Sequence, residues 1–259
     1  MRIVGIIIFV LCLIITASTM EVVMPEIKIL YDNISAQKGV KPAWGFSALI
    51  QYRGKNILFD TGGKADVLLS NMKAMRVSPE AITDIFISHI HWDHTGGLFG
   101  FLCKNHKVKV YVPDSFSRAY RNEIKASGAE CVGTKGFTKI AKDIYSSGAM
   151  GKEIKEQALI IDTPKGLVVI TGCAHPGILN IIKKATRSLE QPLFAVLGGF
   201  HLASKSAAEI KIIIAEFKRL GVTHVGPCHC TGEKAIQMFK LAFKENYIKM
   251  GVGRVLRDL

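Results

Sequence analysis

Two patterns of hydrophobic residues recur along the chain, and together they predict strands and helices in alternation. Short apolar runs bounded by turn residues are typical of strands, and such runs lie at 27–31, 46–52, 56–59, 84–87, 108–112, 158–162, 166–171, 193–197, 224–227 and 251–256. Apolar residues three and four positions apart predict helices at 65–75, 114–127, 178–189, 206–220 and 233–243. This order of elements predicts an α/β fold.

Local patterns add detail to this prediction. Arg53-Gly54-Lys55 forms a tight turn between the second and third strands, which predicts that the first three strands make an antiparallel meander. Ser206 and Glu209 have the spacing of a capping box, which starts a helix. Residues 128–156 instead have poor periodicity and frequent Gly, Lys and Ser. We expect a surface excursion there that covers the site as a lid.

Composition indicates a folded protein with a basic surface. The 259 residues are 49% hydrophobic and 21% charged, which suffices for a sizeable core. Lys and Arg outnumber Asp and Glu by 34 to 21, and the net charge of +13 favours anionic partners, although a solvated basic surface is the simpler interpretation. The basic residues are scattered, so we expect no specific nucleic-acid binding. Six cysteines without a C-x-x-C pair predict free thiols, and the composition leaves the oligomeric state open.

The first 19 residues have the character of a leader. Residues 3–15 are almost wholly apolar, which is short of the roughly 20 residues of a spanning helix but matches the core of a secretory signal peptide. The alternatives are an uncleaved anchor, with membrane contact through residues 3–19, and a true start at Met20 or Met24. The first two interpretations imply export or membrane anchoring, and the third a cytoplasmic protein. We expect residues 20–259 to form a single domain.

The densest polar feature is Ser88-His89-Ile90-His91-Trp92-Asp93-His94-Thr95-Gly96-Gly97, directly after an apolar β-branched run. In an extended segment alternate side chains share a face, so we expect His89, His91 and Asp93 to converge on one point. His94 would then point towards a second position nearby. Imidazole and carboxylate ligands at the mouth of a strand suit one or two divalent metal ions.

Histidines also follow three later strands, as His175, His201 and His229. Ligands of layered α/β proteins gather at the carboxyl ends of strands, so we expect these rings to join the first cluster. Chance placement of histidine after four separate strands is a poor explanation of this recurrence. The sequence therefore predicts an ion-binding pocket assembled from distant segments.

The His-x-His-x-Asp-His motif at 89–94, the Gly-Cys-Ala-His motif at 172–175 and the late His229 resemble the metallo-β-lactamase superfamily. The resemblance implies a four-layer αββα sandwich with metal ions between the two sheets at one edge. It implies one metal ion held by His89, His91 and His175, and a second held by Asp93, His94 and His229. Asp60, in Phe59-Asp60-Thr61-Gly62, resembles the carboxylate that orients these ligands.

The chain departs from the common pattern at one position. Most members with two metal ions have a bridging Asp after the strand that matches 193–197, whereas Gly198-Gly199-Phe200-His201 follows it here. His201 is therefore a candidate metal ligand or catalytic acid/base, with a hydrogen-bonded residue at a helix start as the alternative. A bound metal lowers the pKa of its water to roughly 7, and Asp93 could accept a proton from that water as a catalytic residue. Neutral imidazoles suit Zn²⁺, while the carboxylate also admits Mn²⁺ or Fe²⁺.

Trp44-Gly45-Phe46-Ser47, Glu156-Gln157-Ala158-Leu159 and His229-Cys230-Thr231-Gly232 resemble one branch of this superfamily, typified by archaeal dihydropterin–ribofuranosylaminobenzene 5′-phosphate synthases. Those transferases join a pterinylmethyl diphosphate to an aryl ribosyl phosphate. We therefore expect a metal-dependent hydrolase, or a transferase of this synthase type, acting on an anionic small molecule. The alternatives are a secreted β-lactamase, a lactonase or glyoxalase-like hydrolase, and, in another class, a non-catalytic metal-binding sensor.

Overall fold

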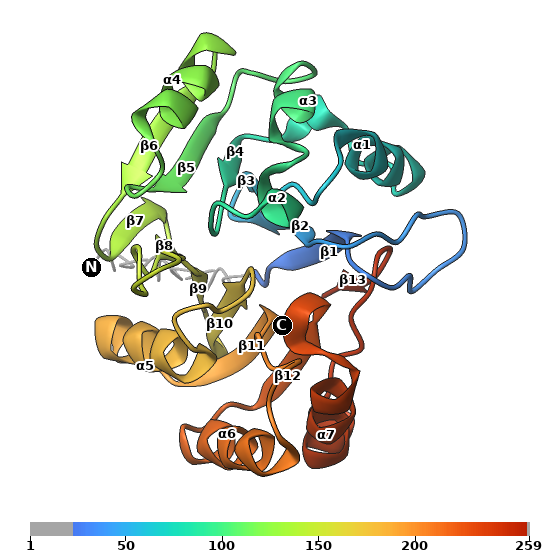
Figure 1. Cartoon of the computed structure of the whole chain (residues 1–259), viewed down its shortest axis with the longest axis vertical. Helices are drawn as coiled ribbons and strands as arrows, with labels where there is room; N and C mark the ends of the chain where they lie inside the picture. The colour runs from blue at the N-terminus through green and yellow to red at the C-terminus, as the bar shows by residue number, and fades with distance from the viewer. Residues whose placement is uncertain (1–22, 258–259) are drawn as a thin grey trace, which may run out of the picture.

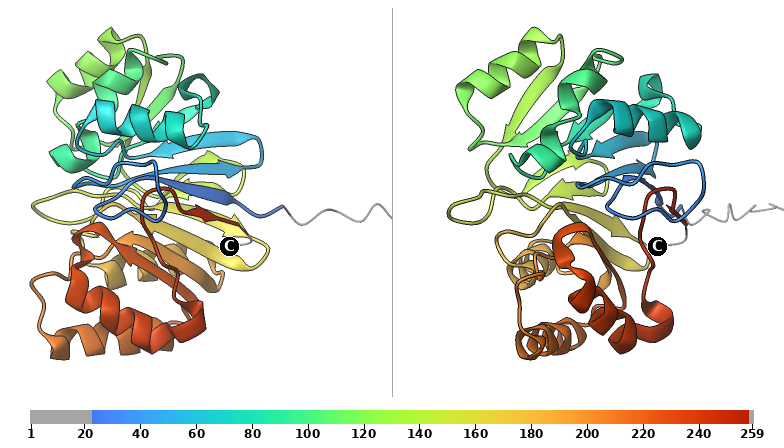
Figure 2. Two further views of the ribbon diagram at one scale, coloured as in Figure 1. Left: turned by 90° about the vertical axis from the view of Figure 1, so that its right-hand side faces the viewer. Right: turned by 45° about the vertical axis from the view of Figure 1, so that its right-hand side comes forward.

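The computed structural model describes residues 23–257, so the predicted leader at 1–19 lies outside the described residues. Two β-sheets face each other at the centre of the molecule, and helices cover the outer face of each (Figure 1). The side views show the same succession of helices, sheet, sheet and helices (Figure 2). The fold is the four-layer αββα sandwich that was expected from the sequence, and it contains both strands and helices in alternation.

The first sheet has seven strands in the spatial order β13-β1-β2-β3-β4-β5-β6. Their bounds are β1 (Glu26–Tyr31), β2 (Ser47–Tyr52), β3 (Lys55–Phe59), β4 (Asp84–Phe86), β5 (Lys109–Pro113), β6 (Glu130–Thr134) and β13 (Val255–Leu256). The predicted meander is confirmed, because β1, β2 and β3 pair antiparallel. Strands β3 to β6 pair in parallel, so the carboxyl ends of β3 and β4 lie side by side. This arrangement brings Asp60 next to the histidine loop that follows β4.

The second sheet has six strands in the order β12-β11-β10-β9-β8-β7. Their bounds are β7 (Thr138–Ala141), β8 (Ile144–Ser146), β9 (Leu159–Thr163), β10 (Gly166–Thr171), β11 (Leu193–Gly199) and β12 (His224–Cys228). Strands β10, β11 and β12 pair in parallel, whereas β7 to β10 pair antiparallel. The carboxyl ends of β10, β11 and β12 therefore share one edge, and the segments that carry His175, His201 and His229 begin there.

Helices cover the two outer faces, and apolar side chains fill the three spaces between layers. The helices are α1 (Ala65–Ala74), α2 (Trp92–Thr95), α3 (Leu98–Leu102), α4 (Arg118–Ala126), α5 (Ile178–Leu189), α6 (Ala207–Arg219) and α7 (Glu233–Phe243), with 3₁₀ turns at Pro79–Ala81, His229–Thr231 and Lys244–Asn246. One apolar cluster lies between the sheets, and one lies between each sheet and its helices. The predicted capping box starts α6, where Ser206 and Glu209 exchange hydrogen bonds.

The surface excursion expected at 128–156 is wrong for most of its length. These residues form β6 at one edge of the first sheet and β7 and β8 at one edge of the second. Edge strands are short and half-exposed, so Lys and Gly are tolerated and the hydrophobic period is weak. Residues 147–156 form the longest part of this stretch without a strand, and Met150 to Ile154 line a cavity beside His175.

Two further observations concern residues 23–257 alone. Every cysteine in this part of the chain has a free thiol, as expected from the spacing. Among the described helices, none is both long enough and apolar enough to cross a membrane. The boundary at residue 20 stays a prediction.

Candidate metal centre

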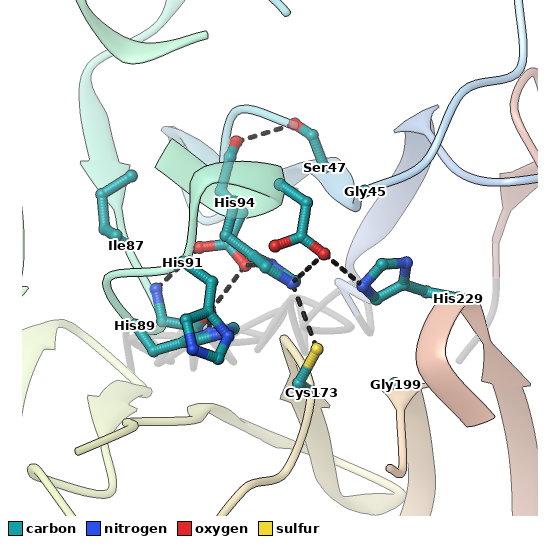
Figure 3. Close-up of polar contacts among 12 residues, drawn as sticks. Gly45, Ser47, Ile87, His89, His91, His94, Cys173, Gly199 and His229 are labelled. Carbon is teal, nitrogen blue, oxygen red and sulfur yellow. Dashed lines mark hydrogen bonds and ion pairs between the residues drawn. The ribbon is translucent and has the colours of Figure 1, made fainter. Parts of the chain in front are cut away.

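Histidines from four separate segments meet at the shared edge of the two sheets. His89 and His175 follow strands of different sheets, yet their ring centroids lie 4.8 Å apart. The ring centroids of His94 and His229 lie 5.0 Å apart. Figure 3 shows His94, His229 and Cys173 pointing towards one another, with His89 and His91 beside them. Side chains of the strand ends therefore converge on one place, as the sequence predicted.

The first set of potential ligands is His89, His91 and His175, whose nitrogen atoms all lie within 4.8 Å of one another. Nε2 of His89 lies 3.1 Å from Nδ1 of His91. The other nitrogen of His89, Nδ1, lies 2.9 Å from the Ser88 hydroxyl, which fixes the ring. Nε2 of His175 is buried and has no hydrogen-bond partner among the described residues. An ion bound by this set would satisfy it.

The second set is Asp93, His94 and His229, all buried. Oδ2 of Asp93 lies 3.2 Å from Nε2 of His229 and 3.8 Å from Nε2 of His94. Nδ1 of His229 lies 3.0 Å from Oδ1 of Asn33, so its Nε2 faces the centre. This Nε2 contacts Asp93 but forms no well-oriented hydrogen bond within residues 23–257.

The expectation that His89, His91 and Asp93 share one face of an extended segment is wrong. The chain leaves the extended conformation at Trp92 and forms the short helix α2. Amide groups of His94 and Thr95 donate to the carbonyl of His91, which closes this turn. The turn carries Asp93 away from the first histidines and places it with His94 and His229 instead. The assignment implied by the family resemblance matches this placement.

Asp60 is the buried residue that joins the two halves of the histidine loop. Its carboxylate accepts hydrogen bonds from the amide and the hydroxyl of Ser88, both at 2.7 Å. Oδ2 also lies 2.7 Å from Nδ1 of His94. A proton on Nδ1 leaves the lone pair of Nε2 free for a metal ion. Burial lowers the pKa of His94, but the Asp60 carboxylate outweighs it and the net shift is upward.

Glu156 is a buried acid to which sequence reasoning gave no role. Its side-chain oxygens accept hydrogen bonds from the backbone amides of Cys173, Ala174 and His175, at 2.8 to 2.9 Å. It therefore holds the loop that presents His175. Burial raises the pKa of Glu156 to about 7, against the lowering effect of the three amides. The only sequence signal for this role was the place of Glu156 in the Glu156–Leu159 motif. A carboxylate that binds backbone amides requires no particular residue types in its partners, so it produces no recognisable sequence pattern.

Backbone strain also gathers at this edge. Among nine non-glycine residues with positive φ in the described chain, four lie at the site: Asp60 (50°), Ala174 (60°), His201 (54°) and His229 (50°). Such conformations cost on the order of 1–3 kcal/mol each and persist where surrounding contacts hold them. They turn side chains from the strand ends into the space between the sheets.

His201 lies apart from the second set of ligands. Its side chain groups with Cys173 and Cys230, and its ring centroid is 4.4 Å from that of His175. A hydrogen bond with Cys230 raises the pKa of His201. Cys173 and Cys230 were not foreseen as site residues. A 3₁₀ turn at His229–Thr231 follows β12, and the Cys230 thiol in this turn is buried beside Cys173 and His201.

The electrostatics of the cluster suit a divalent cation. Burial lowers the pKa values of His89 and His91, and burial together with neighbouring imidazoles lowers that of His175 to about 4. Burial raises the pKa of Asp93, but its contacts with His229 and His94 have the larger effect and lower the pKa to about 2. Neutral imidazoles beside one carboxylate form a typical ligand set for a transition metal.

The distances between ligand atoms also fit. Two ligands on a tetrahedral ion, with bonds of about 2.1 Å, lie about 3.4 Å apart. The observed separations of 3.1 Å, 3.2 Å and 3.8 Å fall around this value. Nε2 of His175, which is buried without a hydrogen-bond partner among the described residues, points to the same conclusion. The residues present therefore fit bound metal.

Fold and site define a two-sheet α/β protein with a cluster of metal ligands at the common edge of its sheets. The family model of the metallo-beta-lactamase superfamily matches residues 45–182. The chain belongs to this superfamily.

Individual relatives agree with this assignment. The chain is 31% identical to the 7,8-dihydropterin-6-methyl-4-(beta-D-ribofuranosyl)-aminobenzene-5′-phosphate synthase of Methanocaldococcus jannaschii, over 83% of this chain and 91% of that protein. It is similar to a crystal structure of a metal-dependent hydrolase of the beta-lactamase superfamily, with a TM-score of 0.76, 30% identity and coverage of 90% and 99%. The metallo-beta-lactamase fold protein YhfI from Bacillus subtilis shares the fold, with a TM-score of 0.67 at 12% identity and coverage of 90% and 98%.

Proposed function

We propose that the protein is a metal-dependent transferase of the dihydropterin–ribofuranosylaminobenzene 5′-phosphate synthase type, which joins two anionic small molecules. Its similarity to the synthase, at 31% identity over most of both chains, supports this proposal. Similarity to a metal-dependent hydrolase at 30% identity supports hydrolysis as the second candidate.

Two cavities beside the ligand cluster distinguish the transferase from the hydrolase. One, of about 610 Å³, is lined by His175 and the 150–154 loop. The other, of about 590 Å³, is lined by His229 and Trp44. A transferase must hold two substrates against one centre, whereas a hydrolase needs room for one substrate and water. The presence of a separate cavity against each set of ligands therefore favours transfer.

The side chains that line the cavities suit anionic and aromatic substrates. Lys152 lines the first cavity, and Lys240 and Lys249 line the second. Their positive charge would attract phosphate groups. Trp44 is 53% exposed, and its ring centroid lies 5.0 Å from that of His229. It offers a flat apolar surface on which a heteroaromatic ring could stack close to the metal ligands.

In such a transfer an amine nitrogen bonds to a methylene carbon, the carbon–oxygen bond to diphosphate breaks, and the amine gives up a proton. His89, His91 and His175 would hold one metal ion, and Asp93, His94 and His229 a second, with Zn²⁺ preferred and Mn²⁺ or Fe²⁺ admitted. A bound divalent ion supplies Lewis acidity for phosphoryl oxygens. Asp60 and Glu156 keep the ligand loops in place, and the lysines orient the anionic groups.

The test is an assay of diphosphate release with 6-hydroxymethyl-7,8-dihydropterin diphosphate as donor. We expect release to depend on added 4-(β-D-ribofuranosyl)aminobenzene 5′-phosphate and on metal. Lys152→Ala and Lys240→Ala should raise KM for different substrates, whereas Lys125→Ala, on α4 and lining neither cavity, should change neither. Release without the second substrate would instead support hydrolysis. A metal-loaded protein inactive on both this pair and a phosphodiester and lactone panel would contradict both candidates.

A further inference from the structure

Cys173 lies between the two sets of imidazole ligands. Its thiol is buried, and Sγ is 3.2 Å from Nε2 of His94. Sγ also lies within 4.8 Å of the ligand nitrogens of both His89 and His94. His89 belongs to the first set and His94 to the second, so the sulfur lies close to one member of each set.

The chain has no carboxylate at the end of β11, where most members of the superfamily with two metal ions have a bridging Asp. The strand that would carry a bridging Asp, β11, ends in Gly198-Gly199. A Cβ atom on Gly199 would clash with the carbonyl oxygen of Gly172, and it would come within 2.7 Å of Sγ of Cys230 and 3.2 Å of Cα of Cys173. The backbone of residues 172–173 and the Cys230 thiol therefore occupy the space beside Gly199, and a larger residue at this position would not fit.

The position of Cys173 is held rigidly by its surroundings. Its backbone amide donates to Glu156 at 2.9 Å, and the next residue, Ala174, has a φ of 60°. Sγ of Cys230 lies 3.6 Å from the carbonyl oxygen of Cys173 and groups with His201 on the outer side. Preorganised sulfur and nitrogen donors of this kind bind zinc and other borderline-soft ions in preference to magnesium.

We propose that Cys173 is a metal ligand shared between the two histidine sets, and that Cys230 and His201 support it on the outer side. Binding replaces the sulfur–hydrogen bond with a sulfur–metal bond, and the proton leaves to solvent. The inference rests on the metal-dependent site proposed above and extends it to a ligand set that contains sulfur. It also explains how a centre without the bridging Asp can still connect two ions.

Cobalt substitution of the full chain tests this proposal. Co²⁺ bound by a thiolate gives a near-ultraviolet charge-transfer band in addition to the visible bands of the ion. We expect this band in the Co²⁺ protein and its loss in Cys173→Ser, with visible bands retained. Cys103→Ala, which is exposed, and Cys228→Ala, which is buried but outside every ligand group, serve as controls that keep the band.

X-ray absorption of the zinc-loaded unmodified protein gives an independent measurement if Cys173→Ser fails to fold. A zinc–sulfur distance of about 2.3 Å is expected, beside nitrogen and oxygen ligands at about 2.0–2.2 Å. A shell of nitrogen and oxygen alone, or a charge-transfer band that persists in Cys173→Ser, would overturn the proposal. Sulfur ligation without transferase activity would contradict only the proposed function, and activity without sulfur ligation only this inference.

Discussion

Oδ2 of Asp60 lies 2.7 Å from Nδ1 of His94, although the two residues follow different strands. The contact exists because β3 and β4 are parallel neighbours, so their carboxyl ends release the chain at the same edge. Asp60 is fully buried and also binds Ser88, so one carboxylate fixes both ends of the histidine loop. The geometry of the candidate metal centre depends on this residue, which itself belongs to neither set of ligands.

Asp60→Asn should weaken metal binding while leaving the fold intact. The amide has nearly the same shape, but it removes the negative charge that holds the Nδ1 proton of His94. Loss of such an outer partner typically reduces metal affinity 10–100-fold. Competition with a chromophoric chelator measures this directly, with Asp114→Asn, exposed at the surface, as control. Unchanged affinity in Asp60→Asn would remove this residue from the support of the site.

Glu156→Gln should destabilise the loop that carries His175. The side-chain NH₂ group would face backbone amides, so at least one donor loses its acceptor in a fully buried position. A buried unsatisfied group costs about 1–3 kcal/mol. Urea unfolding of the metal-free variant measures the loss, against Glu123→Gln on the exposed face of α4. Equal midpoints for the Glu156 variant and the unmodified protein would disprove the anchoring role.

Gly172→Ala should disturb the centre by steric conflict alone. A Cβ atom at this position would clash with the Ser88 hydroxyl and would lie 3.0 Å from Oδ2 of Asp60. Overpacking of this kind costs about 1–3 kcal/mol. Thermal unfolding and chelator competition should both show the effect, whereas Gly136→Ala has no atom within 4 Å of its new methyl group. Normal metal affinity in the Gly172 variant would mean that the loop relaxes freely.

Removal of metal should lower the thermal stability of the purified protein. Ligand binding to the folded state alone stabilises it by about 2.7 kcal/mol at a free concentration one hundred times Kd. Among the ligand atoms, Nε2 of His175 has no hydrogen-bond partner in the described residues, so it stays unsatisfied when no ion is bound. Calorimetry before and after chelation, then after addition of Zn²⁺, should show a fall and a recovery of Tm. Identical Tm values in all three samples would argue against bound metal.

The stability of the α5–α6 contact should depend on pH through Glu216. Arg219, at 2.6 Å, and Lys183, at 2.8 Å, lower the pKa of Glu216 to about 2. Because this pKa is below the unfolded value of 4.5, the stabilisation is present above pH 4.5 and is lost as pH falls towards 2. The stability difference from Glu216→Gln should therefore shrink on acidification, and a carboxyl NMR titration should give a pKa near 2. An ordinary pKa would rule out persistent ion pairs.

Much of the fold could be predicted because apolar periodicity is a local property. The meander, the helix that begins after Ser206 and the positions of histidines after four strands all follow from short-range patterns. Prediction failed at 128–156, where edge strands gain their stability from partners far away in sequence rather than from their own apolar residues. It also failed at Asp93, because one helical turn at Trp92 reverses the face on which the side chain lies.

The sequence by itself determined which residues could bind a metal ion and that they follow strands, since both are properties of residue type and spacing. Residue spacing placed Asp93 with the wrong histidines, and only the tertiary structure decided its position and showed that Glu156 and Cys173 lie with the ligands. The reason is physical. Contacts of a buried carboxylate with backbone amides, and the approach of a thiol to a distant imidazole, depend on how the two sheets pack, and no local pattern encodes that distance.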